Sequence, residues 1–149
     1  VSMTEAVTNI GVTGTRNPLP AIQEESLQQV LASLYRLGAR ILHHGDCVGA
    51  DKTADIAAFN LGMHIESHPP QSARHRAFCD ALVVHRPKPY LARNRDVVNA
   101  CQVLVGCPKG PETPRGGTWY TVRYARKAGC QVILVWPDGS VTGDLKTTD

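Results

Sequence analysis

The sequence predicts an α/β protein with a Rossmann-like, doubly wound and mostly parallel sheet flanked by helices. Short apolar segments alternate along the chain with segments whose apolar residues recur at helical spacing. Each expected strand is continuously apolar, which is typical of parallel strands covered on both faces. Glycines stand just past three expected helices, at Gly38, Gly62 and Gly129, where a left-handed cap favours glycine.

The first half of the chain is expected to form three strands and two helices. The expected elements are a strand over 7–12, a helix over 22–37, a strand over 40–43, a helix over about 54–61 and a short strand over 64–67. Ala54, Ala57 and Ala58 give the second helix a small-residue face that suits close packing on a sheet.

The second half begins with a mostly irregular segment over 71–89, within which 81–84 is a candidate short strand. The remaining expected elements are a helix over 90–100, a strand over 102–106, a polar loop over 108–114, a helix over 116–127 and a strand over 131–136. We expect one domain over 1–149, with a core over about 9–136 and a tail over 137–149 that has too few apolar residues to pack much.

The composition excludes several classes of protein. The chain has 149 residues and a net charge of +3, and its longest apolar stretch is shorter than the ~20 residues of a membrane-spanning helix. No basic-then-apolar leader opens it, so we expect a soluble, cytoplasmic protein without membrane contact. The five cysteines are odd in number and form no C-x-x-C pair, which favours a reducing compartment.

Basic residues concentrate between Arg74 and Asp96, where six arginines and lysines stand against two aspartates. This stretch is either an anion-facing surface or a solvated basic face. Aromatic residues make up only 5% of the chain, so platforms for stacking nucleic-acid bases are scarce. Nucleic-acid binding therefore ranks lowest among the functions considered.

In a doubly wound sheet the ligand lies outside the carboxyl ends of the strands, near the reversal of strand order. The first loop there contains Gly14, Thr15 and Arg16. Glycine allows close approach of a ligand, and the hydroxyl and guanidinium suit phosphate or carboxylate. The alternative is a turn with a surface arginine. The G-x-G-x-x-G spacing is missing, which disfavours a dinucleotide cofactor, and we expect no cofactor.

The second loop runs from His44 to Asp51. Gly45 and Gly49 flank a strand-to-helix turn that would direct backbone amides at an anion. Asp51 is interpreted as a helix N-cap, and Asp46 is expected closer to the crevice. Both aspartates are weak candidates for catalysis.

Metal-type ligands occur at His43, His44, Asp46 and Cys47. Adjacent side chains on a strand point to opposite faces, so these four do not converge easily. We therefore expect no metal site in this segment.

Two further segments carry candidate binding residues. Arg93 and Asn94 are interpreted as reaching back to a ligand from the start of a helix, the alternative being an exposed basic turn. Gly116, Gly117 and Thr118 open the next helix, where free amides and a hydroxyl suit a phosphate. Without a following lysine, this loop is not a Walker-type P-loop.

Aromatic residues near these loops have a structural interpretation. Trp119 and Tyr120 could flank a base, although at least one of them is expected in the core. Tyr90, Tyr124 and Trp136 are interpreted as packing residues.

The order of these motifs, over about residues 9–136, resembles the SLOG superfamily, which includes YspA-like proteins, DprA, molybdenum-cofactor carrier proteins and cytokinin-activating phosphoribohydrolases. The likeness to the YspA-like branch is the nearest. The resemblance implies a nucleotide or nucleotide-derived ligand, its phosphate held by the loops at Gly14-Thr15-Arg16 and Gly116-Gly117-Thr118, and a homodimer.

The phosphoribohydrolase branch carries the motif P-G-G-x-G-T-x-x-E, whose glutamate acts in cleavage of the glycosidic bond. Alignment on Gly117 and Thr118 puts Thr121 at the glutamate position, and Glu112 lies on the wrong side of the loop. Our leading hypothesis is therefore a nucleotide-binding module. The alternatives are a nucleoside-monophosphate hydrolase or ribosyltransferase that uses Asp46 or Asp51, and a DprA-like nucleic-acid-binding protein.

Overall fold

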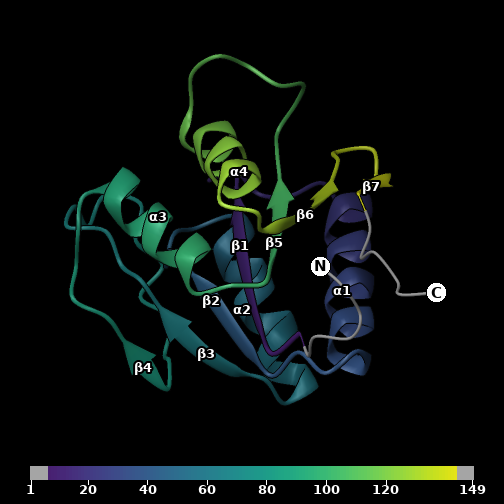
Figure 1. Ribbon diagram of the computed structural model, residues 1–149, viewed down its shortest axis with the longest axis horizontal. Helices are drawn as coiled ribbons and strands as arrows, with labels where there is room; N and C mark the ends of the chain where they lie inside the picture. The colour runs from purple at the N-terminus through teal and green to yellow at the C-terminus, as the bar shows by residue number, and fades with distance from the viewer. Residues whose placement is uncertain (1–6, 144–149) are drawn as a thin grey trace.

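Seven strands form one sheet in the computed structural model, which describes residues 7–143 (Figure 1). The strand order is β4-β3-β2-β1-β5-β6-β7, and every pairing is parallel except that of β6 with β7. The strands are β1 (Asn9–Gly14), β2 (Ile41–His44), β3 (His64–Ser67), β4 (Val83–Val84), β5 (Val103–Cys107), β6 (Gln131–Val135) and β7 (Val141–Thr142). The predicted mostly parallel sheet is confirmed.

Four helices in the described residues cover the two faces of the sheet. They are α1 (Ala21–Arg36), α2 (Ala50–Leu61), α3 (Tyr90–Asn99) and α4 (Gly117–Lys127). Helices α1 and α2 pack side by side on one face, and α3 and α4 pack together on the other (Figure 1). The architecture is the predicted Rossmann-like sandwich of three layers.

Each face has its own apolar core. On the first face, Leu27, Leu31 and Leu34 recur at helical spacing along α1 and are almost fully buried. On the second face, Val97 of α3 packs near Trp119 of α4 and the inner strands. Because both faces are covered, β1 and β5 are apolar and buried through most of their length.

The strand order reverses between β1 and β5, which places a crevice at their carboxyl ends. At Gly14, the last residue of β1, a Cβ would lie 2.5 Å from the Cβ of Ala50 and 2.7 Å from the carbonyl oxygen of Cys107. Glycine is therefore required here so that β1 can pass between β5 and the start of α2.

The tail differs from the sequence-based expectation. Val141 and Thr142 form the antiparallel edge strand β7 on β6, and the Trp136 indole N–H donates to Thr142 Oγ1 at 2.8 Å. The sequence did not predict this strand, but both of its residues are exposed, so it buries little surface. Residues 144–149 lie outside the described range. None of the described helices has the length and apolar character needed to cross a bilayer.

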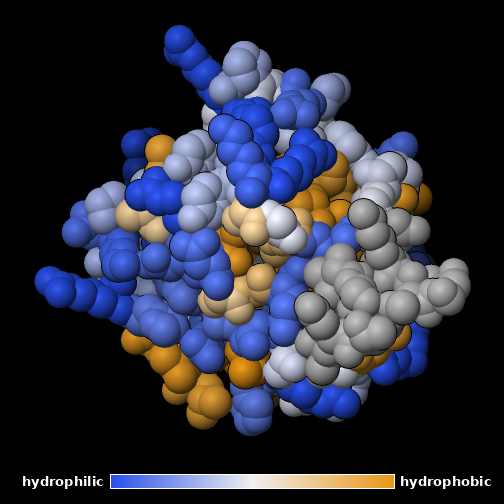
Figure 2. All heavy atoms as spheres, in the orientation of Figure 1, coloured by the Kyte–Doolittle hydropathy of each residue, from blue (hydrophilic) through white to orange (hydrophobic). Residues whose placement is uncertain are grey.

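Most of the surface in Figure 2 is hydrophilic, but apolar side chains gather at the sheet edge where β4 lies. Leu82, Val83 and Val84 are exposed there. They belong to the irregular stretch over 71–89, which the structure confirms as largely without regular secondary structure.

Candidate functional site

A cavity of about 900 Å³ lies at the carboxyl ends of β1 and β5. Nine of the eleven predicted binding residues line it: Gly14, Thr15, Arg16, Gly45, Arg93, Asn94, Gly116, Gly117 and Thr118. Asp46 and Gly49 do not. The structure therefore brings the four predicted motifs to one place, although they come from segments far apart in sequence.

The start of α4 forms one wall of the cavity. Gly116 is the N-cap, with φ of 108°, and no side chain caps the helix. The first intrahelical bond runs from the Tyr120 amide to the Gly116 carbonyl at 3.1 Å. The amides of Gly117, Thr118 and Trp119 thus have no acceptor within the helix, and the positive end of the helix dipole is directed at the cavity.

Basic side chains surround the same opening. Arg16, Lys109 and Arg115 are exposed and line the cavity, whereas Asp51 is the one carboxylate among the lining residues. The guanidinium of Arg16 stacks over the Tyr90 ring, 4.4 Å from its centroid, which restrains the arginine at the cavity wall. This part of the molecule favours an anion.

Tyr90 and Lys109 are lining residues that sequence reasoning missed. The interpretation of Tyr90 as a packing residue is incomplete, because Tyr90 is only half-buried and lies in the cavity wall. Lys109 comes two residues after the end of β5, at the same sheet edge as Thr15. Its place after a strand was the signal that could have identified it.

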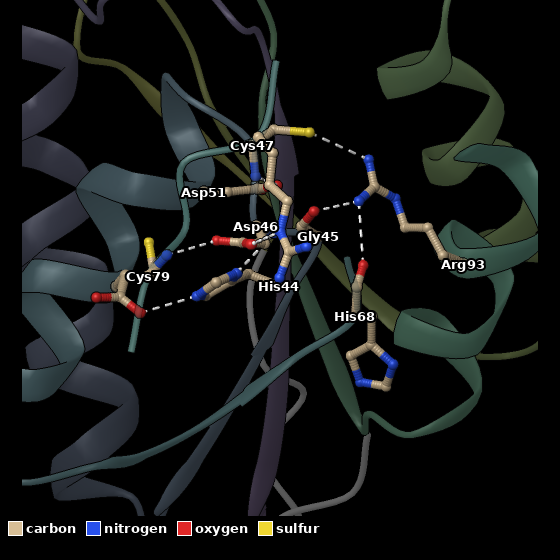
Figure 3. Close-up of polar contacts among 10 residues, drawn as sticks. His44, Gly45, Asp46, Cys47, Asp51, His68, Cys79 and Arg93 are labelled. Atoms are coloured by element: carbon tan, nitrogen blue, oxygen red, sulfur yellow. Dashed lines mark hydrogen bonds and ion pairs between the residues drawn. The ribbon is translucent and has the colours of Figure 1, made fainter. Parts of the chain in front are cut away.

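Arg93 is buried, with only 5% of its surface exposed, and its guanidinium is held by the protein (Figure 3). It donates to the carbonyl oxygens of Gly45 and His68, the latter at 3.1 Å, and to the side-chain oxygen of Asn94. Its remaining nitrogen lies 3.4 Å from Cys47 Sγ. Arg93 therefore fixes the loop after β2 while it contributes positive charge to the cavity.

Asp46 points away from the cavity, into the segment that follows β3 (Figure 3). Its backbone has φ of 55°, and its buried carboxylate accepts from Arg76 Nε at 2.7 Å and from the Cys79 amide at 2.8 Å. The expectation that Asp46 lies closer to the crevice than Asp51 is wrong. The left-handed backbone at Asp46 turns its side chain toward residues 76–79.

Asp51 lines the cavity from the first turn of α2. The N-cap of α2 is Gly49, so the interpretation of Asp51 as N-cap is wrong; its carboxylate accepts from the Cys47 amide at 3.2 Å. Burial raises the pKa of Asp51, and the charges of His44 and Arg93 oppose that rise.

Gly49 has a packing role. Its φ is 87°, and a Cβ there would overlap the carbonyl of Thr15 and lie 2.8 Å from Arg16 Cα. The Ala50 amide donates to the Thr15 carbonyl at 3.0 Å. Gly49 thus lets the loops after β1 and β2 touch, which positions Arg16.

His43 and His44 point to opposite faces of the sheet, as the alternation of strand side chains predicts. His43 contacts His68 and Asn9, whereas His44 Nε2 lies 2.8 Å from Asp55 of α2. The side chains of His43, His44, Asp46 and Cys47 therefore do not converge on one point.

Most basic side chains between Arg74 and Asp96 are held by contacts within the protein, and two of them pair with a carboxylate. Arg76 pairs with Asp46 and Lys88 with Asp96, both at 2.7 Å, and Arg95 donates to the Tyr120 hydroxyl at 2.8 Å. With Arg93 buried, four of the six basic side chains have intramolecular partners. This arrangement does not favour a long groove for nucleic acid.

Comparisons with known proteins find solved structures with a similar fold but no matching sequence family. No family model matches, and neither does any curated protein. The molybdenum cofactor binding protein from Rippkaea orientalis is 21% identical with a TM-score of 0.68, covering 87% of this chain and 77% of that one. The Moco carrier protein from Chlamydomonas reinhardtii is 26% identical with a TM-score of 0.58, covering 86% and 75%.

A third similar structure is the single-stranded-DNA-binding DNA processing protein A from Helicobacter pylori. It is 18% identical with a TM-score of 0.64, covering 89% of this chain and 66% of that one. These are the protein classes that the sequence motifs indicated. The chain shares the fold of these proteins.

The glutamate position of the SLOG phosphoribohydrolase motif has a structural role here. Thr121 is buried, and its hydroxyl donates to the Gly117 carbonyl at 2.7 Å inside α4. Glu112 pairs with Arg123 at 3.1 Å and Arg126 at 3.7 Å, and it does not line the cavity. Neither residue supplies a carboxylate to the cavity.

Proposed function

We propose that this chain binds a nucleotide or a nucleotide-derived phosphate ligand in the cavity between β1 and β5. One observation carries the proposal: the Gly14-Thr15-Arg16 loop and the uncapped start of α4 meet at a single cavity. Its volume, about 900 Å³, lies within the range of small-molecule sites. A helix start with free amides and nearby arginines is a common way to bind phosphate.

The cavity offers separate places for the two parts of such a ligand. The phosphate would bind at the amides of Gly117 and Thr118, with Arg16 and Arg115 balancing its charge. The ring would lie along the apolar wall, to which Val12 and Pro108 contribute. Two of the similar structures are named for the molybdenum cofactor, so a phosphorylated pterin is included among the ligands to be tested.

Isothermal titration calorimetry tests the proposal. The panel contains mononucleotides, dinucleotides, ADP-ribose, cyclic dinucleotides and a phosphorylated pterin. We expect one of these to bind, and Arg16→Ala to weaken that binding about tenfold, since an exposed charge-assisted contact contributes roughly 1–2 kcal/mol. Arg36→Ala, on α1, is the matched control. Absence of heat with every compound would overturn the proposal.

A second candidate function is cleavage of a nucleoside-monophosphate glycosidic bond, because the cavity holds one carboxylate suited to proton transfer. Asp51 is buried there with a raised pKa, so it can carry a proton at a higher pH than an exposed aspartate. This function requires base release from AMP that is abolished in Asp51→Asn. Release that persists in this variant excludes Asp51 as the acid.

Three further expectations remain predictions. A homodimer is implied by the SLOG resemblance, and light scattering after size-exclusion chromatography tests it. A cytoplasmic location follows from the composition. Nucleic-acid binding ranks below small-ligand binding because most of the basic stretch is paired internally; a steep fall of DNA affinity with salt would reverse this ranking.

A further inference from the structure

A cluster of histidines lies outside the cavity, toward the β4 edge of the sheet. His43 of β2 and Glu66 of β3 are register partners, so their side chains share one face. Helix α3 covers this face of the sheet. Gly11 of β1 is the register partner of His43, and a Cβ on Gly11 would contact Val97 of α3. His68 follows β3 and His85 follows β4, which brings four metal-type ligands together.

The nitrogen and oxygen atoms of this cluster converge. His43 Nδ1 lies 3.0 Å from His68 Nε2 and 3.9 Å from Glu66 Oε1, and these three atoms all lie within 4.8 Å of one another. His85 Nε2 lies 2.8 Å from the same Glu66 oxygen, and its ring stacks on His68 at 4.1 Å. Tetrahedral Zn²⁺ with bonds of about 2.0–2.2 Å separates its ligand atoms by roughly 3.4 Å, so His43, Glu66 and His68 need adjustments of about 1 Å. His85 would have to turn out of its stack on His68 to join them.

The hydrogen bonds orient His43 for this role. Its Nε2 lies 2.9 Å from Asn9 Oδ1 and donates its proton to that oxygen, which leaves the Nδ1 lone pair directed at the cluster. An outer partner of this kind fixes the tautomer of most metal-binding histidines. His68 would bind through Nε2 and carry its ring proton on Nδ1, so the metal replaces the proton now shared by the two rings.

A second cluster, at His44, Asp55 and Cys79, has similar spacing but unsuitable chemistry. His44 Nδ1 accepts from the Asp46 amide at 2.9 Å, so its Nε2 holds the proton that Asp55 accepts. Burial, together with the nearby carboxylates, raises the pKa of the Cys79 thiol to about 12. No nitrogen lone pair and no thiolate are therefore directed at that point.

We propose that His43, Glu66 and His68, joined by His85, bind a divalent transition-metal ion such as Zn²⁺. Neutral imidazoles with a carboxylate are typical ligands of this ion. The ion would enter from the side of His85, whose side chain is 42% exposed. Bound there, it would tie β2 and β3 to the segment after β4. This proposal is independent of the nucleotide site.

Metal titration of the full chain tests the proposal. Metal-stripped protein is titrated with Zn²⁺ by calorimetry and with Co²⁺ by d–d absorption. We expect one equivalent to bind, with at least tenfold lower affinity in His68→Gln and in His85→Ala. His64→Ala removes an exposed histidine from β3, the strand that carries Glu66, and serves as the matched control with unchanged affinity.

The same variants define the results that would overturn the proposal. Circular dichroism establishes that each variant is folded; if His68→Gln is not, the solvent-accessible His85→Ala carries the comparison. The proposal is overturned if wild type binds no more tightly than the His68→Gln/His85→Ala double variant. It is equally overturned if Cys79→Ser, rather than His85→Ala, abolishes binding.

Discussion

The guanidinium of Arg93 occupies the space that a side chain on Gly45 would need. Its Nη1 donates to the Gly45 carbonyl, and a Cβ built on Gly45 would overlap the guanidinium. The pair joins the start of α3 to the turn between β2 and α2, although 48 residues separate them. One wall of the cavity therefore depends on glycine at position 45.

Gly45→Ala should destabilise the protein. The added methyl forces the Arg93 guanidinium away from its hydrogen-bond partners, and overpacking of this kind costs about 1–3 kcal/mol. Urea denaturation measures the change in the free energy of unfolding. Gly110→Ala is the control, because a Cβ there meets nothing within 4 Å. Equal stability of the two variants would contradict the packing role of Gly45.

Asp46→Asn should lower stability without removing ligand binding. The charge-assisted bond to Arg76 is lost, at a cost of about 1–3 kcal/mol, whereas the cavity wall is unchanged because Asp46 does not line it. Asparagine tolerates the positive φ at this position. Urea denaturation and nucleotide titration measure the two effects, with exposed Asp80→Asn as control. Loss of ligand binding in a folded variant would place Asp46 in the site after all.

Tyr90→Leu should weaken ligand binding by about two- to fivefold, the effect of a cation–π contact of roughly 0.5–1 kcal/mol. Without the ring, Arg16 loses the surface that restrains it at the cavity wall. Tyr90→Phe keeps the ring and should bind like wild type. Calorimetric affinities for the same nucleotide compare them. Equal loss in both variants would assign the effect to the hydroxyl.

The raised pKa of Asp51 predicts a pH dependence of stability. As pH rises above about 4, the unfolded chain releases this proton first, so the folded state is progressively disfavoured until the pH passes the raised native pKa. In Asp51→Asn that part of the decline should be missing. Urea denaturation of both proteins across this window measures it. Identical pH profiles would show that Asp51 titrates normally in the fold.

The sheet and the place of the site were predictable from the sequence because both follow from local patterns. Continuous apolar strands separated by helices give a parallel sheet, and the loops after its strands meet at one edge. Gly14, Arg16 and Gly117 were found by this reasoning. The weak strand β7 was not, because its pairing depends on a contact between Trp136 and Thr142 after the turn.

The roles of residues within one loop were not predictable. Gly45 and Gly49 look alike in sequence, yet one leaves room for Arg93 and the other for the Thr15 carbonyl. Asp51 lines the cavity and Asp46 does not, because the left-handed backbone at Asp46 turns its side chain away. The histidine cluster depends on strand register and on loop ends, which join residues 19 to 25 positions apart.

A crystal structure with the nucleotide that binds most tightly in calorimetry tests the central claim most directly. We expect phosphate oxygens within hydrogen-bond distance of the Gly117 and Thr118 amides, with Arg16 beside them. Density for the nucleotide outside the cavity between β1 and β5, with its phosphate away from the start of α4, would contradict the account.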